Sequence, residues 1–155
     1  MRILTIDPGL TTGLAYANFE DGSLPVPFTD MPHGFEAAVN AFNDFLDSEM
    51  PTYRYPDLVV IEKFTINAQT AKKSTAGSNL AIELIGAAKY LAYMINIPVE
   101  EQSPADAKNF ATDAKLRRIK WHRPGPDHQN DALRHLLLAA VRHQQLDLSL
   151  LLPQT

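Results

Sequence analysis

Residues 2–17 read Arg-Ile-Leu-Thr-Ile-Asp-Pro-Gly-Leu-Thr-Thr-Gly-Leu-Ala-Tyr-Ala, and this stretch decides how the rest of the chain is read. The apolar run of residues 3–6 predicts a buried strand, and Asp7 stands where that run stops. A proline and two glycines within residues 8–13 indicate a tight turn, after which residues 14–19 resume an extended pattern. We therefore expect a hairpin whose first strand holds a carboxylate at the edge of a cleft. An aspartate that only shapes the turn is the plainer alternative.

Composition limits the possible classes of protein. With 155 residues and 45% apolar content, the chain is predicted to form one globular domain over residues 1–155. It has no cysteine, which excludes disulfides, thiolate metal sites and a cysteine nucleophile. The first residues fit neither a signal peptide nor a membrane span, so we expect a soluble cytoplasmic protein with no membrane partner. The formal net charge of −4 argues weakly against a nucleic-acid partner, so the local distribution of charge matters more than the sum.

Hydrophobic patterns predict the order of the remaining elements. Residues 57–62 repeat the opening pattern, because a short apolar run again stops at an acid, here Glu62. A strand in the proline-rich residues 23–32 would lie at a sheet edge, since proline cannot donate to a neighbouring strand. A further strand is expected over residues 98–102. Helices are expected over residues 34–50, over residues 79–95, from Ser103 onward and from Asp127 onward.

The loop of residues 63–78 follows the second acid. It is polar, rich in small residues and without a clear period. Loops next to a catalytic group commonly touch substrate, and Lys72 and Lys73 are the candidate DNA contacts within this one.

The helix expected over residues 79–95 is apolar on more than one side, which indicates burial against more than one partner. Four of its residues are expected to face the sheet: Leu80, Leu84, Leu91 and Ile95. Four others would need a second partner: Ile82, Ile85, Ala92 and Met94. We predict a homodimer through this helix, and packing under other helices of the same chain is the alternative.

Residues 115–123 form a local basic segment in an acidic protein. The segment holds five basic residues and no acid: Lys115, Arg117, Arg118, Lys120 and Arg123. A solvated helix face is the usual explanation of such a run, but the embedded Trp121 favours a segment that contacts phosphates.

His128 and Asp131 are three residues apart at the start of the last helix, so they share one face of it. Taken alone, an aspartate near a helix N-terminus is favoured by the helix dipole, and a lone histidine is usually structural. Together with Asp7 and Glu62 they form a set of oxygen ligands and one imidazole, which suits Mg²⁺ or Mn²⁺ better than zinc. Two such ions could support phosphodiester hydrolysis. Asp127 could replace or assist His128 in this set.

Three motifs resemble a known family. They are Ile-Asp-Pro-Gly-(x)₃-Gly at residues 6–13, Val-Ile-Glu at residues 60–62 and His-x-x-Asp-Ala-Leu at residues 128–133. Their order and spacing resemble the acidic motifs of the RuvC-type Holliday junction resolvases of the RNase H-like superfamily, and the size is similar to that of the short RuvC-like endonucleases of bacteriophages.

The resemblance implies an α/β fold, with an RNase H-like mixed five-stranded sheet flanked by helices on both faces. It implies a crossover junction endodeoxyribonuclease that cuts branched DNA as a homodimer with two Mg²⁺ or Mn²⁺ ions per site, in the cytoplasm of a prokaryotic host. The implied metal-binding and catalytic set is Asp7, Glu62, His128 and Asp131. Lys108 resembles a basic residue near the scissile phosphate, and Phe64 resembles an aromatic residue at the junction centre.

Other functions remain open at this stage. The opening motif also resembles the phosphate-binding loop of actin-like kinases and ATPases, although those proteins close two lobes over a nucleotide. An RNase H-like nuclease directed at RNA is a second alternative, but that branch tends to place a basic residue where this chain has Thr11 and Thr12. A non-catalytic DNA-binding module is a third, and it gives no reason for carboxylates at the ends of two buried strands.

Overall fold

The computed structural model describes residues 1–47, 55–65 and 76–152. Within them, five strands form one mixed sheet: β1 (Arg2–Asp7), β2 (Gly13–Asn18), β3 (Phe28–Asp30), β4 (Leu58–Glu62) and β5 (Val99–Gln102). Their order across the sheet is β3-β2-β1-β4-β5. The first three strands pair antiparallel, whereas β4 runs parallel to both β1 and β5. The predicted hairpin, edge strand and mixed sheet are confirmed.

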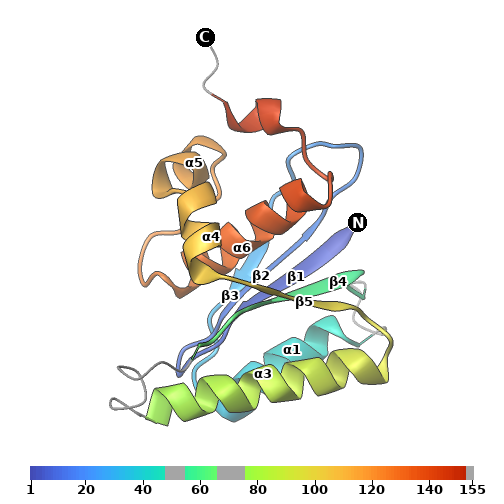
Figure 1. Ribbon diagram of the computed structural model, residues 1–155, viewed down its shortest axis with the longest axis vertical. Coiled ribbons are helices and arrows are strands. Elements are labelled where there is room, and N and C mark those ends of the chain that lie inside the picture. Colours follow the sequence, from blue (N-terminus) through green and yellow to red (C-terminus); the bar gives the residue numbers. More distant parts are fainter. Residues whose placement is uncertain (48–54, 66–75, 153–155) are drawn as a thin grey trace.

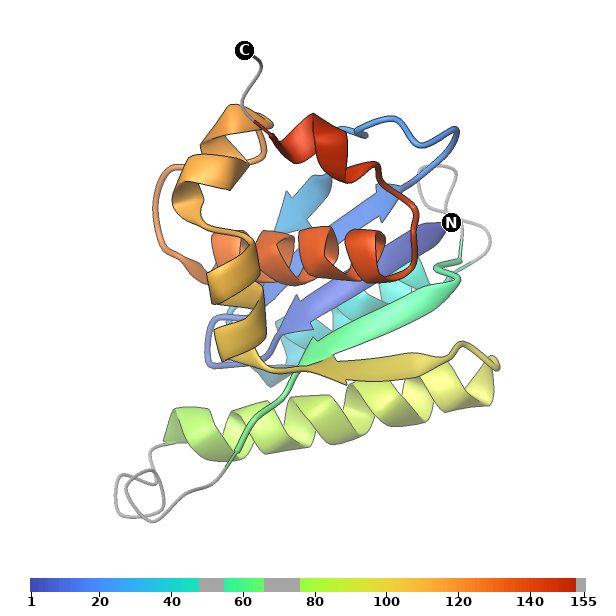
Figure 2. The same cartoon turned by 45° about the horizontal axis from the view of Figure 1, so that its top comes forward.

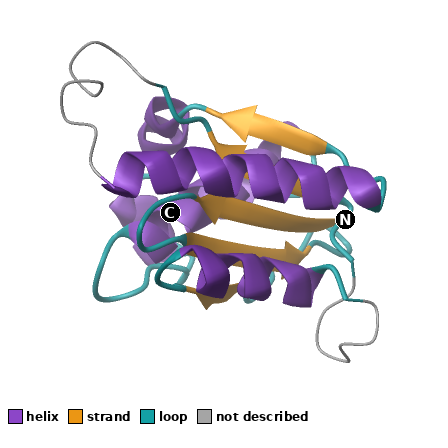
Figure 3. Cartoon of the chain, turned by 90° about the horizontal axis from the view of Figure 1, so that it is seen from below, coloured by secondary structure: helices purple, strands orange, loops and turns teal. Residues whose placement is uncertain are grey.

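Helices cover both faces of the sheet, as predicted. Helices α4 (Pro104–Phe110), α5 (Asp113–Arg118) and α6 (His128–Arg142) lie on one side, with α6 against the strands (Figures 1 and 2). Helices α1 (Phe35–Phe45) and α3 (Ala76–Met94) lie next to each other on the opposite side, which Figure 3 shows from below. A short 3₁₀ helix, η1 (Leu148–Leu151), follows α6.

Alternation along β1 and β4 divides the interior into two cores and orients the acids. Side chains two apart on a strand share a face, so Ile3 in the core under α6 places Asp7 on the α6 side. Between them, Thr5 donates from its Oγ1 to the Ala132 carbonyl of α6 at 2.7 Å. The same period on β4 runs from Leu58 in that core to Glu62. Both acids therefore end neighbouring strands on the α6 face of the sheet.

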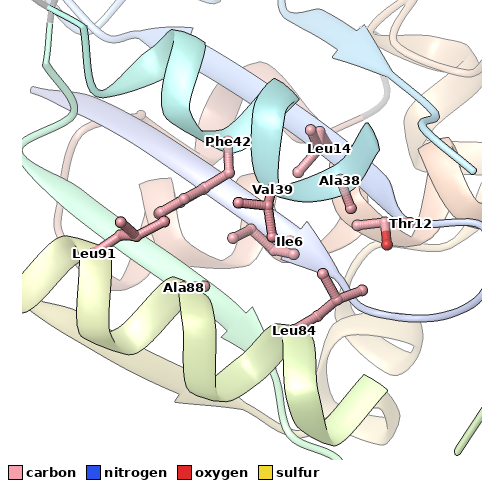
Figure 4. Close-up of a pocket in the computed structure, with 9 residues that line it drawn as sticks. All are labelled: Ile6, Thr12, Leu14, Ala38, Val39, Phe42, Leu84, Ala88 and Leu91. Carbon is pink, nitrogen blue, oxygen red and sulfur yellow. The ribbon is translucent and has the colours of Figure 1, made fainter. Parts of the chain in front are cut away.

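The other core lies between the sheet, α1 and α3, and it contains a small apolar cavity (Figure 4). Figure 4 labels the nine residues that line it: Ile6, Thr12, Leu14, Ala38, Val39, Phe42, Leu84, Ala88 and Leu91. These residues include one hydroxyl group and no carboxylate, and the cavity lies on the opposite side of the sheet from Asp7 and Glu62. It is a packing feature rather than a candidate site.

Helix α6 is deeply buried along most of its length. Residues 132–140 are all buried, including Arg134 and His135. The sheet covers one side of the helix and α4 covers another, so its core-facing surface is wider than one stripe.

The orientation of α3 differs in part from the prediction. Ala92, expected at a subunit interface, is fully buried, and Ile85 packs partly buried against the core. Ile95, expected to face the sheet, is exposed because it follows the last residue of the helix. Ile82 and Met94 are exposed, as a partner surface would require.

One aromatic residue also differs from expectation. Trp121 is only 1% exposed and its Nε1 donates to the Pro25 carbonyl at 2.9 Å. Trp121 is thus a core residue. The prediction that it belongs to a segment contacting phosphates is wrong.

No helix among the described residues is long and apolar enough to cross a lipid bilayer.

Candidate active site

Three carboxylates from distant parts of the sequence converge at one end of the sheet. Asp7 is the last residue of β1, Glu62 is the last residue of β4, and Asp131 lies in the first turn of α6 (Figure 2). Adjacent residues Ile6 and Ile61 pair across the two parallel strands, which sets the two strand-end acids side by side. The structure therefore brings together all three predicted acids.

Asp7 is the most deeply placed of the three acids, with 8% of its surface exposed. Burial, and after it the nearby charges of Glu62 and Asp131, raise the pKa of its carboxyl group from 3.8 to about 7. His128 acts in the opposite direction, because its Nδ1 lies 3.3 Å from Asp7 Oδ2. Concentrated negative charge in a buried place is the electrostatic condition under which a cation binds well.

Gly13 lets the start of α6 approach the hairpin. A Cβ atom at this position would lie 1.9 Å from the His128 carbonyl oxygen. That distance is too short for any side chain to be accommodated there. The glycine of the opening motif is therefore required by contact between β2 and α6, in addition to the turn chemistry that the sequence suggested. This contact holds His128 over Asp7.

Asp131 is bound by two cationic side chains. Lys108 of α4 places its Nζ 3.2 Å from Asp131 Oδ2, so the predicted basic residue does lie at the acid cluster. Arg134, one turn along α6, hydrogen-bonds to Asp131 Oδ1 and also to Asp113 of α5. The bond to Arg134 is the main cause that lowers the pKa of Asp113. Sequence reasoning missed Arg134, although its spacing of three from Asp131 was a usable signal.

Glu62 is bound by a buried histidine that sequence reasoning also missed. The Nε2 of His135 lies 2.9 Å from Glu62 Oε2, and its Nδ1 lies 3.0 Å from Gln102 Oε1. Glu62 and Gln102 are paired residues at the ends of β4 and β5, and His135 spans them from α6. The available signal was its spacing of seven from His128, which puts both histidines on one helix face.

The donor set has the chemistry of a site for a hard divalent cation. It consists of Asp7, Glu62, Asp131 and the imidazole of His128, and the pKa of Asp7 is raised first by burial and then by repulsion from the other two carboxylates. Among the residues that the structure describes, no group of three or more histidine and acidic side chains is arranged as a formed metal site. The carboxylate oxygens of Asp131 face Lys108 and Arg134. Asp127, the other candidate ligand, is exposed at the N-cap of α6.

Most of the basic segment has partners within the protein. Lys115 donates from its Nζ to the Phe110 carbonyl at 2.5 Å and lies over the Phe110 ring. Arg118 donates to the Leu151 carbonyl at 2.8 Å, and Arg123 donates to the Pro27 carbonyl at 3.2 Å. These three cations stabilise connections between segments as well as carrying charge.

The remaining predicted DNA contacts are placed differently. Arg117 is exposed and lies 3.7 Å from Asp113, and exposed Lys120 has the left-handed backbone conformation that ends α5. Phe64 is half-buried just beyond the end of β4. Lys72 and Lys73 lie outside the described residues.

The strand order and the helices on both faces define an α/β fold of the RNase H-like class. This fold is shared with Thermus thermophilus RuvC, with a TM-score of 0.65, 19% sequence identity, and coverage of 94% of this chain and 98% of that chain. The structure of T. thermophilus RuvC in complex with a Holliday junction substrate is similar at a TM-score of 0.68 and 19% identity, covering 93% and 95% of the two chains. The resemblance predicted from the three motifs is thus confirmed at the level of the fold.

A weaker likeness, with a TM-score of 0.45 and 12% identity, covers 93% of this chain and 62% of the yeast mitochondrial Holliday junction resolvase Ydc2. No protein-family model matches the chain, and no curated protein matches it in sequence.

Proposed function

We propose that this protein is a metal-dependent endonuclease that hydrolyses phosphodiester bonds in branched DNA, with four-way junctions as its first candidate substrate. The observation that carries the proposal is the convergence of Asp7, Glu62 and Asp131 at one end of the sheet, with a raised pKa at Asp7. A fold shared with a protein solved in complex with a Holliday junction substrate supports the choice of DNA. Flaps and forks are further candidate substrates.

In this proposal Asp7, Glu62, Asp131 and His128 hold one or two Mg²⁺ or Mn²⁺ ions. Bound divalent ions would supply an activated water and charge stabilisation at the leaving oxygen. Asp7 has the central role because it is buried next to the other two charges. Lys108 is 55% exposed at its side chain, so it can exchange its contact with Asp131 for a DNA phosphate.

DNA binding must overcome a formal net charge of −4. Lys108 and the basic residues near α5 supply local positive charge on the side of the sheet that carries the acids. Arg117 and Lys120 are exposed and are the side chains of that segment best placed for phosphate contacts. Phosphate contacts of this kind bind DNA without reading its sequence.

We further propose that the protein acts as a homodimer through α3. Four large apolar side chains of this helix are exposed: Ile82, Tyr90, Tyr93 and Met94. A symmetric dimer would give two equivalent sites for two strands of one junction.

The direct test is a cleavage assay with Mg²⁺ on four-way, flap, fork and linear DNA, with single-stranded RNA as the control. We expect cleavage of branched DNA that stops in excess EDTA. We expect Asp7→Asn to abolish cleavage and to retain most DNA binding, because this carboxylate acts on the transition state rather than on substrate affinity. Full activity of Asp7→Asn, or cleavage by the wild type in EDTA, would contradict the proposal. Hydrolysis of ATP that depends on Asp7, without nuclease activity, would favour the actin-like alternative.

A further inference from the structure

Three histidines in and next to α6 contact acids of the sheet. His128 and His135 lie seven residues apart on one face of the helix, and His143 is its C-cap residue. Each contacts an acid of a different strand: His128 contacts Asp7 of β1, His135 contacts Glu62 of β4, and His143 contacts Glu100 of β5.

The three histidines differ in exposure, and that difference separates their roles. The side chain of His128 is 44% exposed, so it can turn toward a ligand. The side chain of His135 is 1% exposed and is enclosed between α6 and the sheet. A side chain so enclosed has a fixed position, and it can fix the position of the group that it contacts.

We propose that His135, held by Gln102, is the positioning residue of Glu62. The proposal rests on the proposed function, because it assigns Glu62 its place among the metal-binding acids. It adds a residue pair that none of the three acidic motifs contains.

The hydrogen-bonding groups of Glu62 and Gln102 determine which nitrogen of His135 donates. A carboxylate oxygen can only accept, so His135 donates from Nε2 to Glu62 Oε2 at 2.9 Å. Its Nδ1 then faces the side-chain amide of Gln102 at 3.0 Å. Gln102 is 2% exposed, and among the described residues its Nε2 is a buried donor without a partner.

A rotation of the Gln102 side-chain amide gives its unpartnered Nε2 donor a partner. An amide turned by 180° presents its NH₂ group to Nδ1, and a neutral imidazole then keeps its single proton on Nε2. Gln102 thus selects the tautomer that donates to Glu62. Hydrogen bonds to a metal-binding carboxylate commonly orient it, and their loss typically lowers metal affinity 10- to 100-fold.

The register of the sheet makes this geometry specific. Glu62 and Gln102 are paired across parallel β4 and β5, so both side chains leave the same face of the sheet at the same level. The backbone continues the link, because the Lys63 amide donates to the Gln102 carbonyl at 2.8 Å. His135 therefore contacts two side chains that the sheet already holds in register.

The test is Mn²⁺ binding to the full chain without DNA, measured by calorimetry. We expect His135→Leu and Gln102→Leu to lower the affinity about 10- to 100-fold. His135→Gln should recover most of it, because its amide can place a donor near the former Nε2. His143→Leu is the matched control, since it removes a histidine–glutamate contact of the same length, 2.9 Å, from the other end of α6. We expect it to bind Mn²⁺ as the wild type does.

Two results would overturn the positioning role. The first is wild-type Mn²⁺ affinity in folded His135→Leu, or in Gln102→Leu if the histidine variant does not fold. The second is an equal loss in His135→Gln and His135→Leu, which would make His135 a metal ligand itself. A crystal structure of metal-free His135→Leu gives a readout that needs no metal: Glu62 is expected to leave its wild-type rotamer, and an unchanged rotamer would refute the proposal.

The same measurements separate this inference from the proposed function. Mn²⁺ binding that depends on His135, in a protein that cleaves no branched DNA, would support the positioning role and refute the nuclease. A wild type that binds no Mn²⁺ would refute both.

Discussion

Asp7 carries a charge in a place where the folded protein disfavours it. Its pKa rises from an ordinary value of 3.8 to about 7, first through burial and then through Glu62 and Asp131. A raised pKa in the folded state means that the folded protein binds this proton more tightly than the unfolded chain does. The resulting stabilisation is present at low pH and is lost as the pH rises through 7. A site that disfavours its own charge gains stability when a cation enters it.

We therefore expect Asp7→Asn to stabilise the metal-free protein above pH 7. The shift in pKa corresponds to an upper limit of about 4 kcal/mol, and the lost contact with His128 offsets part of it. The measurement is the free energy of unfolding in EDTA at pH 8 and at pH 5. The difference in this free energy between variant and wild type should be smaller at pH 5 than at pH 8.

Added Mg²⁺ provides the complementary control. It should stabilise the wild type at pH 8 and have little effect on Asp7→Asn. A difference between the two proteins that is the same at pH 5 and pH 8 would contradict the assignment of the raised pKa to Asp7.

At the scale of elements, the contact between β2 and α6 sets the geometry of the site. Gly13→Ala would force its Cβ against the His128 carbonyl, and backbone cannot move aside as a flexible side chain can. We expect a loss of about 1–3 kcal/mol in stability and a displaced start of α6, with cleavage reduced accordingly. Chemical unfolding measures the stability. The cleavage assay measures the loss of activity that we expect when His128 and Asp131 are displaced.

Gly86→Ala is the matched control for this prediction. Gly86 lies within α3, and a Cβ there would meet nothing within 4 Å. Alanine in a helix should raise stability by about 0.5–1 kcal/mol. Equal effects of the two substitutions would show that the close approach at Gly13 is unimportant.

The segment around α5 gives a second prediction at this scale. Lys120→Gln should lower the slope of log binding constant against log salt concentration by about 0.9, with unchanged stability, if exposed Lys120 contacts a phosphate. Arg118→Gln should instead lower stability, because Arg118 joins α5 to the Leu151 carbonyl of η1. Salt titrations of DNA binding and thermal unfolding of both variants separate the two roles. An unchanged salt slope for Lys120→Gln would show that Lys120 contacts no phosphate and is only a solvated charge.

Local patterns predicted the strands and the acids well because both depend on neighbours in sequence. An apolar run that stops at Asp7 or Glu62 is visible within six residues, and the alternation along each strand fixes which side the acid faces. Contacts between distant segments were not visible in this way. Gly13 was interpreted as a turn residue because its contact with His128 spans most of the chain.

His135 shows a different limit of sequence reasoning. It lies within the apolar stripe of α6, where a histidine is most simply a core residue, and its acid partner is 73 positions away. Ala92 was assigned to a subunit interface for a related reason. Periodicity gives the angular position of a residue around the helix axis, but it does not give how closely the helix approaches the sheet.

At the scale of the whole molecule, the acids lie on the α6 side of the sheet, and α3 lies on the opposite side (Figure 1). The exposed side chains on α3 are large: Tyr93 is 76% exposed, Tyr90 62% and Met94 59%. Monomeric proteins rarely leave such a group of apolar residues uncovered on one element. A dimer through α3 would cover them and would leave both sites accessible to DNA.

The structure changes which substitutions test this dimer. Ile85 packs partly against the core, so a charge there would damage the fold, whereas Ile82 and Tyr93 are exposed and eleven residues apart on one helix face. We expect Ile82→Glu with Tyr93→Glu to give a folded monomer that still nicks branched DNA but loses paired incision, because each chain keeps its own acids. Val26→Glu is the control, since Val26 is 91% exposed in a loop and its charge should leave the assembly intact. Sedimentation without DNA measures the outcome, and a wild-type monomer at micromolar concentration would restrict any dimer to the DNA-bound state.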